Sequence, residues 1–166
     1  MNKAGFAVLG IIIIILVIIA SLLIFGNKGE DKSVVTLYYI DTTLFKLVKQ
    51  EEVIEGKKEV KSTLNALFKS TPQNGLENLF PEGTEVLNIS YDDDKEILIV
   101  NLNSNLLSIN YGPEVNYLII MSIVYTASEV SGYSRVKLLF DGNQVEFLNN
   151  TIYIGGYFKK DSSVIE

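Results

Sequence analysis

The chain has 166 residues, with 20 acidic and 14 basic side chains and a formal net charge of −6 at pH 7. This balance argues against a nucleic-acid partner, because nucleic-acid-binding domains present basic patches. Histidine and cysteine are both absent, which excludes disulfides, a Ser–His–Asp triad and the usual zinc ligands. We therefore expect no enzyme activity and no catalytic, cofactor-binding or metal-binding residues.

An uncharged run of 22 residues occupies positions 4–25. As a helix it would be about 33 Å long, which matches a bilayer core of about 30 Å. A cleaved signal peptide is the alternative, but it has a shorter apolar core and small residues at the cleavage site. Here bulky residues occupy positions 22–25. A buried core helix is a further alternative, but the run is apolar all round. The run therefore predicts an uncleaved signal anchor, a transmembrane helix over residues 1–26.

The anchor sets the expected organisation of the rest of the chain. Lysines flank both ends of the apolar run, so the positive-inside rule does not decide its orientation. The short amino-terminal stub favours a single-pass protein of the cell membrane with its soluble part outside the cytoplasm. We expect a polar linker at residues 27–33, one domain at residues 34–158 and a tail at residues 159–166.

The first half of the domain predicts a hairpin and a helix. Residues 33–40 are rich in β-branched and aromatic side chains, and residues 44–53 could pair back on them after a turn. Residues 59–69 show helical spacing of apolar side chains on one face. These side chains are Val60, Leu64, Leu67 and Phe68. A proline at position 72 ends this helix, because the residue before proline avoids the α region.

The second half begins with another predicted hairpin, formed by residues 85–91 and 96–102 around an aspartate-rich turn. The second of these strands is apolar on both faces, which is typical of a central strand covered on both sides. Residues 113–130 predict a long, heavily buried helix. Pro113 suits its first turn and Gly132 its end.

The carboxyl-terminal part predicts strands only. Residues 135–140 should form a hairpin with residues 144–148, because Asp-Gly between them is a turn signal. Residues 151–158 predict an exposed edge strand, and edge strands invite pairing with another chain. The candidate interaction residues on this edge are Thr151, Tyr153, Gly155 and Tyr157. The element order predicts an α+β fold in which two helices pack on a small mixed sheet.

Seven sequence runs in unbroken order resemble the GerMN domain, the sporulation and spore germination domain of GerM lipoproteins. The runs are LYYID at 37–41, LVKQEEVI at 47–54, LNALFKSTPQNGL at 64–76, FPEGTEVLNIS at 80–90, VNLNSNL at 100–106, IVYTASE within 118–129 and VKLLFDG at 136–142. The resemblance spans residues 34–147. It implies a relative of the ring-building motifs, in which two helices pack on a small sheet and neighbouring copies stack.

The resemblance also implies a function and marks departures from it. Family members act outside the cytoplasm as non-catalytic scaffold or binding modules, in a sporulation channel complex or beside a membrane sensor kinase. This chain lacks the lipid-attachment cysteine, has one copy of the domain instead of two, and has Thr71-Pro72 where Gly-Pro is usual. We expect a membrane-anchored scaffold that contacts other envelope proteins or copies of itself. The alternative is a ligand-binding module that acts with a membrane sensor.

Two acidic clusters and a set of tyrosines are the remaining candidates. The aspartates at 92–94 could bind a hard cation, but a turn prefers aspartate for conformational reasons alone. Asp41 could pair with Glu51 or Glu52 for acid–base chemistry, but an Asx turn explains it as well. Six tyrosines could form an aromatic surface for a glycan or a protein, although half-buried packing accounts for most tyrosines. They are Tyr111, Tyr117, Tyr125, Tyr133, Tyr153 and Tyr157.

Overall fold

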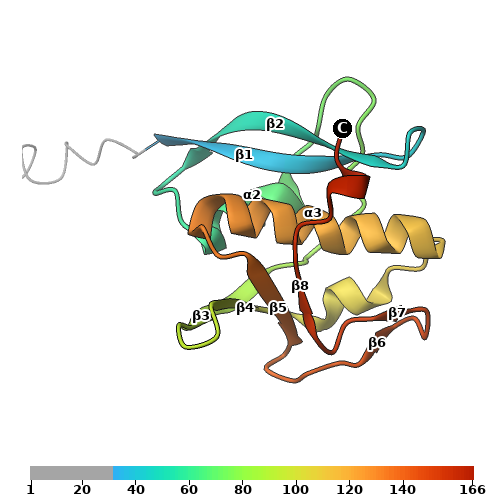
Figure 1. The fold of residues 1–166 in the computed structure, drawn as a ribbon. Helices are drawn as coiled ribbons and strands as arrows, with labels where there is room; N and C mark the ends of the chain where they lie inside the picture. Colours follow the sequence, from blue (N-terminus) through green and yellow to red (C-terminus); the bar gives the residue numbers. More distant parts are fainter. Residues whose placement is uncertain (1–31) are drawn as a thin grey trace, which may run out of the picture. The chain divides into compact units, whose positions relative to one another are not determined.

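A long hairpin opens the part of the chain that the computed structural model describes, residues 32–166 (Figure 1). Strands β1 (Lys32–Asp41) and β2 (Lys46–Glu55) pair in antiparallel register. The carboxylate of Asp41 accepts hydrogen bonds from the backbone N–H groups of Thr43 at 2.8 Å and Leu44 at 2.9 Å. This Asx turn reverses the chain, as the sequence predicted. Because β1 begins at Lys32, the last two residues of the predicted linker are strand.

The predicted signal anchor at residues 1–26 lies outside the described residues, as does most of the predicted linker. Within residues 32–166, no helix is both long enough and apolar enough to cross a membrane.

Both predicted helices are confirmed. Helix α2 (Val60–Lys69) begins where the Oγ of Ser62 accepts the backbone N–H of Glu59 at 3.3 Å. Helix α3 (Pro113–Ser131) has a proline in its first turn and ends at Gly132, whose φ of 76° is left-handed. Glycine adopts this conformation without steric cost. The predicted apolar face of α2 is buried, and so is every residue of α3 from 118 to 128.

A four-stranded mixed sheet contains β3 (Val86–Asp92), β4 (Ile97–Leu102), β5 (Arg135–Phe140) and β8 (Tyr157–Phe158), in the order β3-β4-β5-β8. The hairpin of β3 and β4 is confirmed, with a bulge at its start. Strands β4 and β5 run parallel, since α3 carries the chain back across the sheet. As predicted, β4 is central, but only one of its faces is fully covered, because Ile99 is half-buried.

The predicted turn at Asp141-Gly142 forms, because Phe140 and Asn143 exchange backbone hydrogen bonds of 2.8 and 2.9 Å across it. The predicted pairing of residues 135–140 with residues 144–148 is wrong, since the pairing ends at this bridge and β8 pairs with the start of β5. Strand β6 (Phe147–Leu148) pairs instead with β7 (Ile152–Tyr153). The turn between β6 and β7 holds two asparagines with positive φ, a conformation that asparagine tolerates well. This second turn directs residues 147–148 to β7, so the hairpin that begins at Asp141-Gly142 does not extend.

The single edge strand predicted at residues 151–158 is also wrong. Its first part is β7, in a two-stranded sheet with β6, and its last part is β8, at the edge of the four-stranded sheet. Gly155 and Gly156 lie between them in a bend. Glycines weaken a strand interior and mark places where a chain changes direction.

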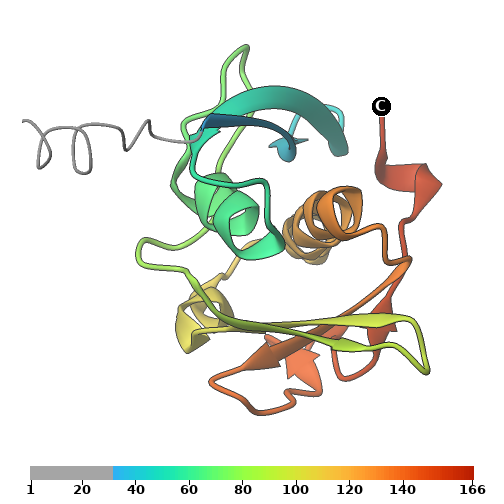
Figure 2. The same cartoon turned by 90° about the vertical axis from the view of Figure 1, so that its left-hand side faces the viewer.

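The helices lie between two sheets, whereas the sequence predicted that they would pack on one. Figure 2 shows the β1–β2 hairpin above the helices and the four-stranded sheet below them. Helix α3 contacts β1 on one side and β5 on the other, and α2 contacts β1 and β3. Two short 3₁₀ turns, at Ser104–Ser108 and Ser162–Val164, complete the fold. The fold class is α+β, as predicted, with its core on both sides of the helices.

Candidate functional site

The four predicted interaction residues lie in different local settings. Thr151 is exposed in the turn between β6 and β7, and Tyr153 is 57% exposed in β7. Gly155 is buried, and Tyr157 is 48% exposed in β8. The structure brings Tyr153 and Gly155 into contact, because a Cβ built on Gly155 would lie 3.0 Å from the hydroxyl oxygen of Tyr153.

We use the name aromatic surface for three exposed side chains, Phe147 and Tyr153 on the β6–β7 hairpin and Tyr157 on β8. The rings of Phe147 and Tyr153 meet edge to face with centroids 5.5 Å apart. The guanidinium of Arg135 lies 5.2 Å from the ring centroid of Tyr157, within cation–π range. Sequence reasoning missed Phe147, which is 50% exposed and pairs with Tyr153 across the β6–β7 hairpin. Recognition of the Asn149-Asn150 turn would have found it.

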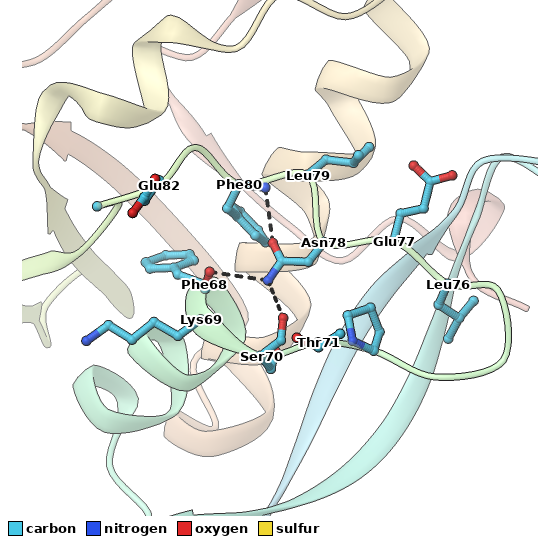
Figure 3. A pocket seen from close by; sticks show the side chains of 12 residues that line it. Phe68, Lys69, Ser70, Thr71, Leu76, Glu77, Asn78, Leu79, Phe80 and Glu82 are labelled. Carbon is cyan, nitrogen blue, oxygen red and sulfur yellow. Dashed lines mark hydrogen bonds between the residues drawn. The ribbon is translucent and has the colours of Figure 1, made fainter.

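A pocket of about 620 Å³ opens beside the end of α2, and Figure 3 shows its lining side chains. The side chain of Asn78 connects the end of α2 to the loop that forms the wall of this pocket. The Nδ2 group of Asn78 donates hydrogen bonds to the carbonyls of Leu67 at 3.1 Å, Phe68 at 3.2 Å and Ser70 at 2.7 Å. Its Oδ1 accepts the N–H of Phe80 at 3.1 Å. The amide thus satisfies carbonyls that the helix end leaves unpaired.

Glu77 and two aromatic rings of this pocket also hold the loop in place. The backbone of Glu77 pairs with that of Ile40, and its carboxylate accepts the hydroxyl of Thr42 at 2.7 Å. The rings of Phe68 and Phe80 pack with centroids 4.8 Å apart. These groups attach the loop to the β1–β2 hairpin and to α2, and their hydrogen bonds are used within the fold.

The acidic candidates are separated in the structure. Asp92 pairs with Lys95 at 3.1 Å, while Asp93 accepts a hydrogen bond from the hydroxyl of Tyr133. Glu51 and Glu52 lie opposite the middle of β1, five and six register positions from Asp41. At about 3.3 Å per residue, this separation excludes a carboxylate pair. Across residues 32–166, no three acidic side chains converge in a way that could hold a metal ion.

Residues 159–166, predicted as a tail, form part of the domain. They cross α3 and reach β2, and we call them the C-terminal clasp. The carboxylate of Asp161 accepts a hydrogen bond of 3.0 Å from the hydroxyl of Tyr117. The backbone carbonyl of Asp161 accepts one of 2.8 Å from the hydroxyl of Tyr125. Lys160 pairs with Glu129 at 3.2 Å. The chain ends against β2, where the N–H of residue 166 donates to the carbonyl of residue 47 at 3.1 Å.

Burial and hydrogen bonds shift the pKa values of several side chains at and near the clasp. Burial, together with the carboxylate of Glu129, raises the pKa of Tyr38 to about 12. Burial and the hydrogen bond to Asp161 raise the pKa of Tyr117 to about 12 as well. The hydrogen bond from Lys160 holds the pKa of Glu129 below its usual value, and hydrogen bonds from Ser163 and Tyr117 do the same for Asp161.

We expect the protein to lose stability as the pH rises from 10 to 12. The folded-state pKa values of Tyr38 and Tyr117 lie above the ordinary value of 10.0. Their stabilising contribution is therefore complete below pH 10 and is lost as the pH rises through the folded-state pKa. Thermal unfolding followed by circular dichroism at several pH values would measure this loss. The double variant Tyr38→Phe, Tyr117→Phe should show a shallower alkaline decline, and an identical decline in both proteins would contradict the assignment.

The comparisons with known proteins agree with this fold. The model of the Germane family, described as sporulation and spore germination, matches residues 36–146, about two thirds of the chain. A search of curated proteins gives no match. A putative lipoprotein from Clostridium perfringens is 21% identical, with a TM-score of 0.54, and the match covers 80% of this chain and 89% of that one.

Two structures of the sporulation protein GerM from Bacillus subtilis are also similar. Its first GerMN domain is 22% identical with a TM-score of 0.54, and the match covers 81% of this chain and 97% of that one. Its tandem GerMN domains are 23% identical with a TM-score of 0.60, and the match covers 79% of this chain and 46% of the tandem. At these identities the structures show the shared fold alone. The family match, within the predicted span of residues 34–147, confirms the resemblance, and the chain belongs to the Germane family of sporulation and spore germination proteins.

Proposed function

We propose that this chain is a non-catalytic, membrane-anchored module that assembles with other envelope proteins, or with copies of itself, in a sporulation, germination or other envelope complex. Membership of the Germane family supports a role in sporulation or spore germination. Two polar side chains of the pocket beside α2, Asn78 and Glu77, are used to hold the loop, which supports a structural role for this pocket. For the same reason we do not favour the alternative of a ligand-binding module that acts with a membrane sensor.

The observation that carries the proposal is the aromatic surface. Each of its three rings leaves about half of its area exposed. Large aromatic side chains bury much area at little conformational cost, and they are enriched at the centres of protein interfaces. Of the other predicted interaction residues, Gly155 lies against the ring of Tyr153, and Thr151 is exposed in the turn between β6 and β7. The contact we propose is therefore made through side chains, since β7 and β8 are only two residues long.

A crosslinking experiment in cells tests this contact. We expect a photo-crosslinking amino acid at Thr151 to give partner or self adducts. The double variant Phe147→Ser, Tyr153→Ser should reduce these adducts at unchanged protein level, because it removes the rings that a partner would bury. Leu44→Ser with Phe45→Ser is the matched control, since these side chains are 54% and 51% exposed at the other hairpin tip. Equal adduct levels in the aromatic variant and the control would contradict the proposal.

The proposed arrangement is a single-pass protein with an anchor at residues 1–26 and an extracytoplasmic domain. The long uncharged run in the sequence supports it.

We expect mass spectrometry of the membrane-extracted protein to find the amino terminus at Met1 or Asn2. A cysteine placed at Ser163 would be unique in this cysteine-free chain. It should react with a membrane-impermeant maleimide on intact cells, because Ser163 is exposed. A mature start near Gly26, or labelling only after lysis, would contradict the arrangement.

A further inference from the structure

The outer edge of β3 is open along most of its length. At the start of β3, two α2 side chains form hydrogen bonds with its backbone. Lys61 Nζ donates to the carbonyl of Leu87 at 3.0 Å, and Asn65 Oδ1 accepts the N–H of Val86 at 2.9 Å. From Asn88 to Asp92, the described backbone hydrogen bonds go to β4 alone. Alternate N–H and C=O groups of an edge strand point away from its neighbour. This stretch therefore presents unpaired backbone groups to solvent.

A groove of about 370 Å³ runs beside this edge, between β3 and the helices. Its apolar lining comes from three elements, with Val60 on α2, Ile89 and Tyr91 on β3, and Val130 on α3. The ring of Tyr91 packs at a tilt of 43° against that of Tyr133, with centroids 5.2 Å apart, and forms one wall of the groove. A strand edge beside an apolar groove is the arrangement that binds extended peptides by strand addition.

The charge beside this groove is opposite to that of the whole chain. The net charge is −6, yet three exposed lysines stand at the start of α2. They are Lys57, Lys58 and Lys61. Within residues 32–166, the ion pairs involve other lysines, Lys95 and Lys160. The one carboxylate among the groove-lining residues is Glu59. The α2 side of the rim is therefore cationic and complementary to carboxylates, whereas the far end of β3 carries Asp92, Asp93 and Asp94.

We propose that this groove binds an extended acidic peptide segment of a partner protein, which adds to β3 as a fifth strand of the four-stranded sheet. The backbone edge supplies the hydrogen bonds. Because successive side chains of a strand point to opposite faces, one set of alternate side chains enters the groove, where it meets the apolar floor and the lysines. This inference rests on the proposed function, because it names the chemistry of one partner of the same assembly module.

Peptide binding to the full chain in detergent micelles tests the inference. The probe is a fluorescein-labelled seven-residue peptide of alternating glutamate and valine, followed by fluorescence anisotropy. We expect it to bind, and we expect a lysine–valine peptide to bind at least tenfold more weakly. Two further versions of the glutamate peptide carry N-methyl groups, one on its odd-numbered and one on its even-numbered backbone nitrogens. At least one of the two should bind at least tenfold more weakly than the unmethylated peptide, because strand addition needs the N–H donors that face β3.

Variants of one helix locate the binding site. Lys58→Glu alone, and together with Lys61→Glu, should weaken peptide binding at least tenfold. Lys69→Glu, at the other end of α2, should leave it unchanged. The melting temperature of each variant verifies that the chain is folded. The inference is overturned if the acidic peptide does not bind at millimolar concentration, if the lysine or methylated peptides bind equally well, or if the chain self-associates through β3 and excludes the peptide.

Crosslinking separates failure of this inference from failure of the proposed function. A photo-crosslinker at Tyr91 reports on the groove, and one at Thr151 reports on the aromatic surface. Adducts from Thr151 without adducts from Tyr91 would leave the proposed function intact and overturn the groove as a binding site. The absence of adducts from both positions would overturn the proposed function itself.

Discussion

Replacement of Leu67 by alanine is expected to lower the free energy of unfolding by about 2–5 kcal/mol, the range for a buried leucine truncated to alanine. Leu67 is fully buried on α2, the helix that packs against β1 on one side and β3 on the other. Loss of its side chain leaves a cavity that neighbouring elements cannot fill without moving. Urea unfolding of the full chain followed by circular dichroism measures the change.

Leu44→Ala is the matched control for this experiment. Leu44 is 54% exposed in the turn between β1 and β2, so its truncation should change stability by less than about 0.5 kcal/mol. Equal stability of the Leu67→Ala variant and the wild-type chain would contradict the packing of α2 between two sheets.

Asn78→Ala is expected to have the second largest effect, about 1–3 kcal/mol, the cost of leaving buried polar groups unpaired. This amide joins three carbonyls at the end of α2 to the backbone of Phe80. Without it, the carbonyls of Leu67, Phe68 and Ser70 lose a donor in a half-buried position. The loop that forms the pocket in Figure 3 should also open more often.

Two measurements check the role of Asn78. Chemical denaturation gives the stability change, and limited proteolysis should show faster cleavage within residues 71–79. Asn143→Ala is the control, because the Nδ2 group of Asn143 donates to the carbonyl of Asp141 at 3.0 Å in an exposed turn. If the two alanine variants were equally stable and equally resistant to protease, Asn78 would not hold the loop.

The predictions from sequence are correct for the helices and hairpins whose interacting residues lie close together in the chain. The buried face of α2 follows from apolar side chains at helical spacing, and the limits of α3 follow from Pro113 and Gly132. The hairpins β1–β2 and β3–β4 follow from two apolar runs that flank a short turn. In each case the interacting residues are close in sequence, so periodicity and turn chemistry are sufficient.

The interaction role of Thr151, Tyr153, Gly155 and Tyr157 stays a prediction, and their local settings depend on the tertiary fold. Exposure of Tyr153 and Tyr157 agrees with their alternation along a strand-like segment. The contact between Tyr153 and Gly155 depends on a bend at the glycines, which breaks the expected strand. The groove beside β3 was not predicted at all, because its lining comes from α2, β3 and α3, and no short stretch of sequence contains that combination.

Sequence patterns were sufficient to predict the α+β class, both helices, two of the hairpins and membership of the Germane family. The position of the helices between two sheets, the pairing of β5 with β4 and β8, and the packing of residues 159–166 over α3 became known only from the folded structure. The choice of strand partner and the docking of the chain end depend on contacts between residues far apart in sequence. For example, Tyr117 and Asp161 are 44 residues apart. Local hydrophobic patterns are the same whichever distant partner a strand finds, so the competition among partners is settled only when the whole core packs.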